Sequence, residues 1–145
     1  MKIEFTVPGQ PVAKARPRFA RRGNFVTTYT PEKTANYETT VKIFASAAMV
    51  GHAPINRPVC MMVNIYMQIP ASWSKRKQFL ANCGMVAATK KPDADNILKI
   101  LKDACNGIVW VDDAQVIEIH LYKRYSDTPR AEVVIEEFSD AIQSA

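Results

Sequence analysis

Five aspartates lie within 21 residues of this chain, a density at which carboxylates can share a bound cation. Like charges at close range raise one another's pKa, so such a cluster is unfavourable unless a cation lies between its members. Pro92 favours extended backbone, and we therefore expect the carboxylates of Asp93 and Asp95 to point the same way. The five are Asp93, Asp95, Asp103, Asp112 and Asp113.

A helix is predicted for residues 95–105, and its polar face carries two of the five aspartates. Asp95, Lys99 and Asp103 recur every four residues and so form one column on that helix. The opposite face is apolar, with Ile97, Leu98, Ile100, Leu101, Ala104 and Cys105. Asp112 and Asp113 lie where extended chain resumes, so only one of the two joins the cluster, and strand alternation does not say which.

Oxygen ligands without a nearby His or Cys favour Mg²⁺, or Mn²⁺ in its place, over zinc. This is the chemistry of phosphodiester cleavage, to which a lysine such as Lys99 adds positive charge. Simpler roles remain open for each residue. Asp95 can cap its helix, Lys99 and Asp103 can form an exposed ion pair, and residues 112–113 can form a turn. Their coincidence in one segment favours the metal site.

Positive charge is concentrated in the first part of the chain. Residues 1–92 contain 14 Lys and Arg against 3 Asp and Glu, whereas residues 93–145 contain 5 against 11. A basic surface is expected to bind a polyanion such as DNA, although a merely solvated basic face is the alternative. The candidate DNA-contacting residues are Lys14, Arg16, Arg18, Arg21, Arg22, Lys75, Arg76, Lys77, Lys90 and Lys91.

The length of 145 residues and an apolar fraction of 48% predict one globular domain, residues 1–138, with a frayed tail at 139–145. No apolar run is long enough to span a membrane and the N-terminus lacks the apolar core of a signal peptide, so a cytoplasmic protein is expected. Cys60, Cys83 and Cys105 are widely spaced and are predicted to be reduced core residues. The two histidines and two tryptophans are predicted to be structural.

The elements that must position the acidic residues follow from hydrophobic periodicity and turn signals. Strands are predicted for residues 2–7, 59–69, 116–122 and 131–138, and helices for 30–51, 74–83 and 95–105. A loop or hairpin is expected around residues 22–24. This order predicts an α+β domain in which a mixed or antiparallel sheet packs with about three helices.

The acidic segment resembles the signature of the RusA family of Holliday junction resolvases. The matching residues are Pro92-Asp93-x-Asp95-Asn96, Lys99, Asp103-Ala104, Gly107 and Asp112-Asp113-x-Gln115-Val116. Upstream, the segment Lys14-x-Arg16-Pro17-Arg18 and the segment Tyr29-Thr30-Pro31 resemble the N-terminal features of phage and Gram-positive members. Together these matches span about residues 7–116.

This resemblance implies a homodimeric, Mg²⁺-dependent endonuclease that makes paired, symmetrical nicks in four-way DNA junctions during recombination and repair, in a bacterial or phage-infected cell. The family's catalytic carboxylates correspond to Asp93, Asp95 and Asp113, and its essential lysine to Lys99, with Asp103 and Asp112 as supporting residues. A dimer suits a junction, which has two equivalent strands to cut. The alternatives are a non-catalytic module that binds branched DNA, or a nuclease that acts on flaps or replication forks.

Overall fold

A mixed four-stranded sheet forms the centre of the protein. The computed structural model describes residues 1–14, 18–23, 25–29 and 32–139, with the backbone alone for 18–22 and 25–29. The strand order is β1-β6-β4-β5, where β4 and β5 are parallel and the other neighbours antiparallel. The strands are β1 (Lys2–Pro8), β4 (Val59–Gln68), β5 (Val116–Ser126) and β6 (Arg130–Glu137). The predicted α+β class with a mixed sheet is confirmed.

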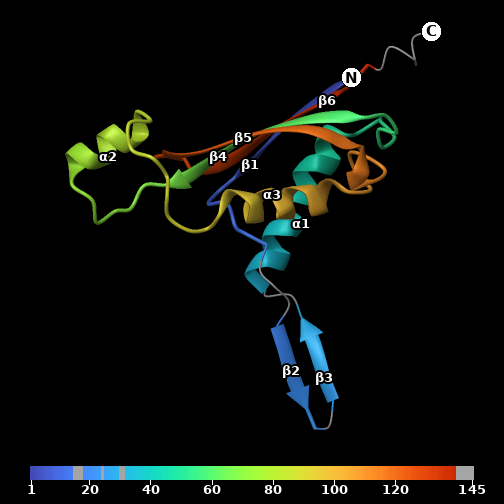
Figure 1. The fold of residues 1–145 in the computed structure, drawn as a ribbon, viewed down its shortest axis with the longest axis horizontal. Coiled ribbons are helices and arrows are strands. Elements are labelled where there is room, and N and C mark those ends of the chain that lie inside the picture. Colours follow the sequence, from blue (N-terminus) through green and yellow to red (C-terminus); the bar gives the residue numbers. More distant parts are fainter. Residues whose placement is uncertain (15–17, 24, 30–31, 140–145) are drawn as a thin grey trace.

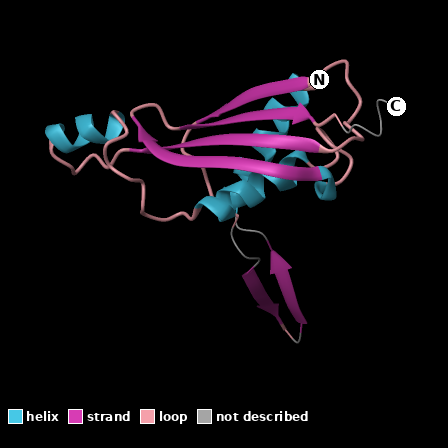
Figure 2. Ribbon diagram, turned by 45° about the horizontal axis from the view of Figure 1, so that its top comes forward, coloured by secondary structure: helices cyan, strands magenta, loops and turns pink. Residues whose placement is uncertain are grey.

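One face of this sheet is buried because apolar and polar side chains alternate along three of its strands. In β4, for example, Met61, Val63 and Ile65 are completely buried, whereas Met62 between them is exposed. The same alternation occurs in β1 and β6, where Val7 and Ile135 are buried. The core therefore lies on one side of the sheet, under the helices shown in Figures 1 and 2.

Two helices, α1 (Glu32–Ala48) and α3 (Ala94–Cys105), cover that buried face (Figure 1). In α3, Ile97, Ile100 and Leu101 are fully buried, and each such side chain contributes roughly 1.5–3 kcal/mol by leaving water. The short helix α2 (Lys75–Asn82) lies beyond the end of the sheet. Ser74 begins it as predicted, since its Oγ accepts the Lys77 N–H at 3.2 Å.

A β-hairpin stands away from this body in both ribbon views (Figures 1 and 2). It consists of β2 (Arg18–Arg22) and β3 (Phe25–Tyr29), which pair antiparallel. Gly23 in its turn has φ 62°, a conformation that glycine adopts without strain. The hairpin expected around residues 22–24 is thus confirmed, although Arg16, Asn24 and the predicted start of α1 at residues 30–31 lie outside the described residues.

Several predicted boundaries were wrong near the acidic segment. Helix α3 begins at Ala94 with Asp93 as its N-cap, because proline restricts only the residue before it and does not keep Asp95 extended. The turn named as an alternative for residues 112–113 is present as the 3₁₀ turn η1 (Asp113–Gln115). The strand after it, β5, continues to Ser126 rather than residue 122. The Gln115 side chain fixes this turn, since its Oε1 accepts the Asp112 N–H at 2.7 Å.

The cysteines do not share one environment, so their prediction as core residues is correct only for Cys105, which is buried in α3. Cys60 is half-buried because it lies on the outer face of β4, and Cys83 is exposed at the end of α2. Of the predicted frayed tail, only Ser139 belongs to the described residues. Within those residues, no helix is both long enough and apolar enough to cross a bilayer.

Candidate functional site

The exposed face of α3 carries the column of polar residues that the sequence predicted. Asp95, Lys99 and Asp103 lie opposite the buried face of the helix and line one shallow cleft of about 240 Å³. The same cleft is lined by Asp113, which lies just before β5, and by Lys102, which the sequence did not single out. Three carboxylates and two ammonium groups therefore face a common space.

Asp113, and not Asp112, is the member of the adjacent pair that lines this cleft. The fully buried Trp110 holds it there, because the indole Nε1–H donates a hydrogen bond to Asp113 Oδ1 at 2.8 Å. Asp112 is exposed and forms the N-cap of the 3₁₀ turn. Of the two residues between which strand alternation could not choose, Asp113 is therefore the one beside Asp95 and Lys99, and Trp110 both packs in the core and orients it.

Cys105 lies in α3 close enough to Asp113 for the charge of that carboxylate to affect the pKa of the thiol. Burial, and then the negative charge of Asp113, raise the pKa of the Cys105 thiol to about 12. The group is therefore protonated at neutral pH and offers no thiolate to a metal ion. What the cleft does offer is carboxylate oxygen, the ligand type preferred by Mg²⁺ and Mn²⁺.

Asp103 is partly neutralised by Lys14 from the N-terminal segment. Lys14 Nζ lies 3.3 Å from Asp103 Oδ2 and 3.0 Å from Glu38 Oε1, and the backbone N–H of Lys14 donates to Asn96 O at 2.9 Å. Burial alone would lower the pKa of Lys14, but the hydrogen bonds and charges of Glu38 and Asp103 raise it above its usual value. Lys14 therefore ties the chain that leads to the hairpin to both α1 and α3. The Lys99–Asp103 ion pair considered from the sequence does not occur.

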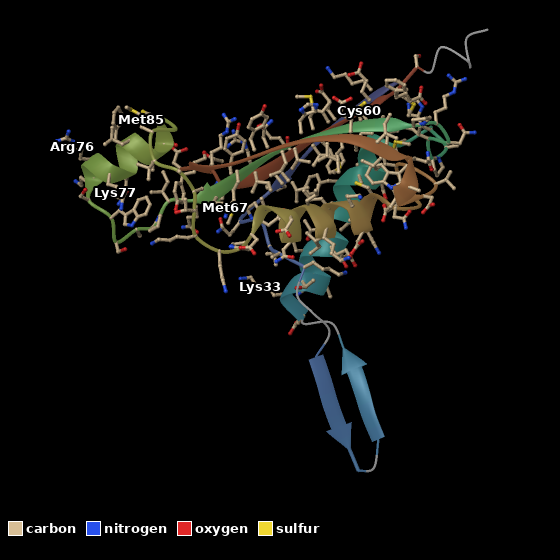
Figure 3. All side chains as sticks on the ribbon, in the orientation of Figure 1. Lys33, Cys60, Met67, Arg76, Lys77 and Met85 are labelled. Carbon is tan, nitrogen blue, oxygen red and sulfur yellow. The ribbon has the colours of Figure 1, made fainter. Side chains whose placement is uncertain are left out.

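Asp93 faces a different space from Asp95. It lines a larger cleft of about 860 Å³, formed by residues 10–13, the start of α1 and the start of α3. The two carboxylates were expected to point the same way on extended backbone, but α3 begins between the two residues, and they line different clefts. Asp93 makes no side-chain capping bond, and Lys33 and Lys91 line the cleft with it. Figure 3 shows Lys33 on the part of α1 nearest the hairpin.

Fewer carboxylates are available to one metal ion than the three that the sequence predicted, because only Asp95 and Asp113 of those three line the same cleft. Among the described side chains, no three His, Cys, Asp or Glu converge closely enough to hold a metal ion. Asp95 and Asp113 nevertheless share a cleft, and neither forms an ion pair with any other described residue. Mg²⁺ is commonly held by one or two carboxylates, with water and substrate phosphate completing its shell. The two carboxylates therefore suit Mg²⁺ that binds together with a phosphate.

Apart from Lys14, the predicted DNA-contacting residues that the structure describes lie on three segments, namely β2 of the hairpin, α2 and the loop before α3 (Figure 1). Helix α2 carries Lys75, Arg76 and Lys77, all exposed, and Figure 3 shows Arg76 pointing away from the body. Lys90 and Lys91 belong to the loop that leads into α3, and β2 of the hairpin carries Arg18, Arg21 and Arg22. The predicted basic residues therefore come from separate elements of the fold, and one of them, Lys91, itself lines the cleft that contains Asp93.

Comparison with known proteins assigns this architecture to a family. The family model described as Endodeoxyribonuclease RusA matches residues 8–136. The chain belongs to the RusA family. The match includes every RusA site residue predicted from the sequence. A protein of Bacillus subtilis (strain 168), described as the uncharacterized protein YqaN, is 41% identical in an alignment of 142 residues that covers 94% of this chain and 97% of that protein. The resemblance to the RusA family is therefore confirmed.

Proposed function

We propose that this member of the RusA family is a Mg²⁺-dependent endonuclease that resolves four-way DNA junctions by paired, symmetrical nicks, with Mn²⁺ as a possible substitute. The observation that supports this most strongly is the cleft in which Asp95, Asp113 and Lys99 lie together. A divalent cation supplies Lewis-acid chemistry there, since it acidifies water and offsets the charge that develops on a phosphate under attack.

Asp95 and Asp113 would hold the cation, because they share the cleft and, unlike Asp103 beside them, form no ion pair with a described residue. Asp93, which lines a different cleft at the start of α3, is the third catalytic carboxylate that we propose. Lys99 faces the same cleft as Asp95 and is placed to offset negative charge on the phosphate that is cut. Trp110 positions Asp113 through its indole N–H.

Two further aspartates support the site indirectly. Asp103 lines the cleft, but its ion pair with Lys14 makes it a positioning residue and not the strongest ligand. Lys14 accordingly acts in holding the site together, which we favour over the DNA contact expected from the sequence. Asp112 precedes the turn that presents Asp113, and its backbone N–H is fixed by Gln115.

DNA would be attracted to the site by basic segments on several elements of the fold. The hairpin strand β2, helix α2 and the loop before α3 carry the arginines and lysines predicted to contact phosphates. We also propose a homodimer, since a junction has two equivalent strands to cut and a two-fold dimer presents two equivalent sites. A dimer is consistent with nicks placed symmetrically in two strands.

A panel of DNA substrates tests this function. A synthetic four-way junction, a flap, a fork and a linear duplex of matched sequence are incubated with the protein in Mg²⁺, in Mn²⁺ and in EDTA. We expect the junction to be nicked in two strands at symmetrical positions with either metal and to stay intact in EDTA. Binding without cleavage in both metals would indicate a non-catalytic module. Faster cleavage of the flap or the fork than of the junction would show that the preferred substrate is not the junction.

A further inference from the structure

A third and smaller pocket lies between the end of the sheet and the loop before α3. Its volume is about 140 Å³, well below the roughly 300–1,000 Å³ of pockets for drug-sized ligands, so it suits a small group. Three of its lining residues are lysines, namely Lys90, Lys91 and Lys123, and no acidic residue is among the described side chains that line it. The chemistry of the pocket therefore favours a small anion.

Lys123 is the member of this group that sequence reasoning missed. It lies on β5 opposite Ile65 of β4, and its Nζ donates a hydrogen bond to the backbone oxygen of Lys90 at 2.6 Å. No described carboxylate forms an ion pair with it. Its neighbour Arg124 lies opposite Tyr66, so alternation along the strand places it on the other face of the sheet, where it lies 5.1 Å from the Tyr122 ring.

An aromatic pair holds further positive charge beside the pocket. The Trp73 and Tyr125 rings meet edge to face with centroids 5.2 Å apart, and Tyr125 lines the pocket. Lys77 Nζ lies 3.9 Å and Lys90 Nζ 5.3 Å from the centroid of the Trp73 ring, and Figure 3 shows Lys77 on the underside of α2. Ammonium groups gathered in this way repel one another, and a bound anion relieves that repulsion.

The pocket adjoins the cleft that contains Asp93. Gln10 and Lys91 line both spaces, so a group bound in the small pocket lies next to one bound in the larger cleft. Consecutive phosphates of a nucleic acid strand are spaced closely enough to occupy neighbouring sites of this kind. A phosphate held by the lysines would therefore belong to the same strand that passes Asp93.

We propose that Lys90, Lys91 and Lys123 form a phosphate-binding subsite that fixes the DNA backbone beside the Asp93 cleft, with Lys123 as a DNA-contacting residue. The inference rests on the proposed function in taking DNA as the polyanion. The subsite sets the register of the strand and reads no base, since phosphate contacts position a duplex without specifying its sequence.

Adjacent residues of β5 provide a matched test. Binding of a four-way junction is measured in EDTA over a series of salt concentrations for the wild type, Lys123→Ala and Arg124→Ala. We expect Lys123→Ala to weaken binding and to reduce the slope of log K against log salt concentration by about 0.9, the value for one lost phosphate contact. Arg124→Ala removes the same charge from the opposite face and should leave the slope unchanged. Lys123→Arg keeps the positive charge and should show the wild-type slope.

Two further results keep the test decisive. Lys90→Ala removes another ammonium group of the subsite and should therefore also reduce the salt slope. It keeps the backbone oxygen that Lys123 contacts, so it serves as the test if Lys123→Ala fails to fold. An unchanged slope in Lys123→Ala or Lys90→Ala, whatever the affinity, would overturn the subsite. The measurement needs no cleavage. A wild-type protein that binds but never cuts therefore contradicts the proposed function and leaves this inference to be judged separately.

Discussion

Asp113→Asn will abolish nicking of a four-way junction, whereas Asp112→Asn, the same change one residue earlier, will leave it nearly intact. The asparagine Oδ1 can still accept the Trp110 N–H, so the turn keeps its shape while the negative charge in the cleft is lost. Stabilisation by a bound cation amounts to several kcal/mol, and 1.36 kcal/mol corresponds to a factor of ten in rate. The expected loss is therefore at least about 100-fold.

The measurement is the single-turnover cleavage rate in Mg²⁺, with junction binding followed in parallel by gel shift. Asp113→Asn should bind as well as the wild type, because the lost carboxylate repels phosphate instead of attracting it. Asp112→Asn should cleave within about threefold of the wild-type rate, since surface substitutions change little. Equal losses in the two variants would show that the cleft has been assigned to the wrong aspartate.

Trp110→Phe will lower the cleavage rate by about 10- to 100-fold and raise the Mg²⁺ concentration needed for half-maximal activity. The change keeps an aromatic ring in the core but removes the N–H that orients Asp113, and loss of such an orienting bond commonly costs this much in metal affinity or activity. A Mg²⁺ titration separates this effect from simple destabilisation, because loss of packing alone reduces the amount of folded protein and not its metal requirement.

The matched control for this prediction is Trp73→Phe. Trp73 is the other tryptophan of the chain, and its recorded contacts are with Tyr125, Lys77 and Lys90 instead of an aspartate. It should leave the Mg²⁺ requirement unchanged. A Trp110→Phe protein with the wild-type Mg²⁺ requirement and rate would mean that the indole N–H does not position a catalytic group.

The polar face of α3 could be predicted from the sequence because it depends on local spacing. A helix places residues four apart in one column, so Asp95, Lys99 and Asp103 had to share a face once the apolar positions identified the other. The strands of the sheet followed in the same way from alternation. Patterns with a short period carry this information without any knowledge of tertiary contacts.

Other features of the site depend on contacts between distant parts of the chain. The turn that presents Asp113 is held by Gln115, whose Nε2 donates to the backbone oxygens of Ile55 and Arg57, 60 and 58 positions away. No local pattern reports those bonds, so alternation could not choose Asp113 over Asp112. The ion pair between Lys14 and Asp103 joins the N-terminal segment to α3 in the same nonlocal manner.

Lys123 was missed for a related reason. It lies in the acidic second part of the chain, next to Arg124, and the predicted strand ended at residue 122, so alternation was not applied to either residue. Only the register of β5 against β4 and the approach of the Lys90 loop give them different surroundings. The count of charges along the chain identified residues 1–92 as basic. The pocket, however, is lined by lysines from both sides of that boundary.

The most direct test of the central claim is a crystal structure of the protein soaked with Mn²⁺, with the metal located by its anomalous scattering. We predict a Mn²⁺ ion in the cleft on the exposed face of α3, in contact with the carboxylates of both Asp95 and Asp113. A Mn²⁺ ion bound elsewhere, with neither carboxylate among its ligands in a crystal of cleavage-competent protein, would contradict the account.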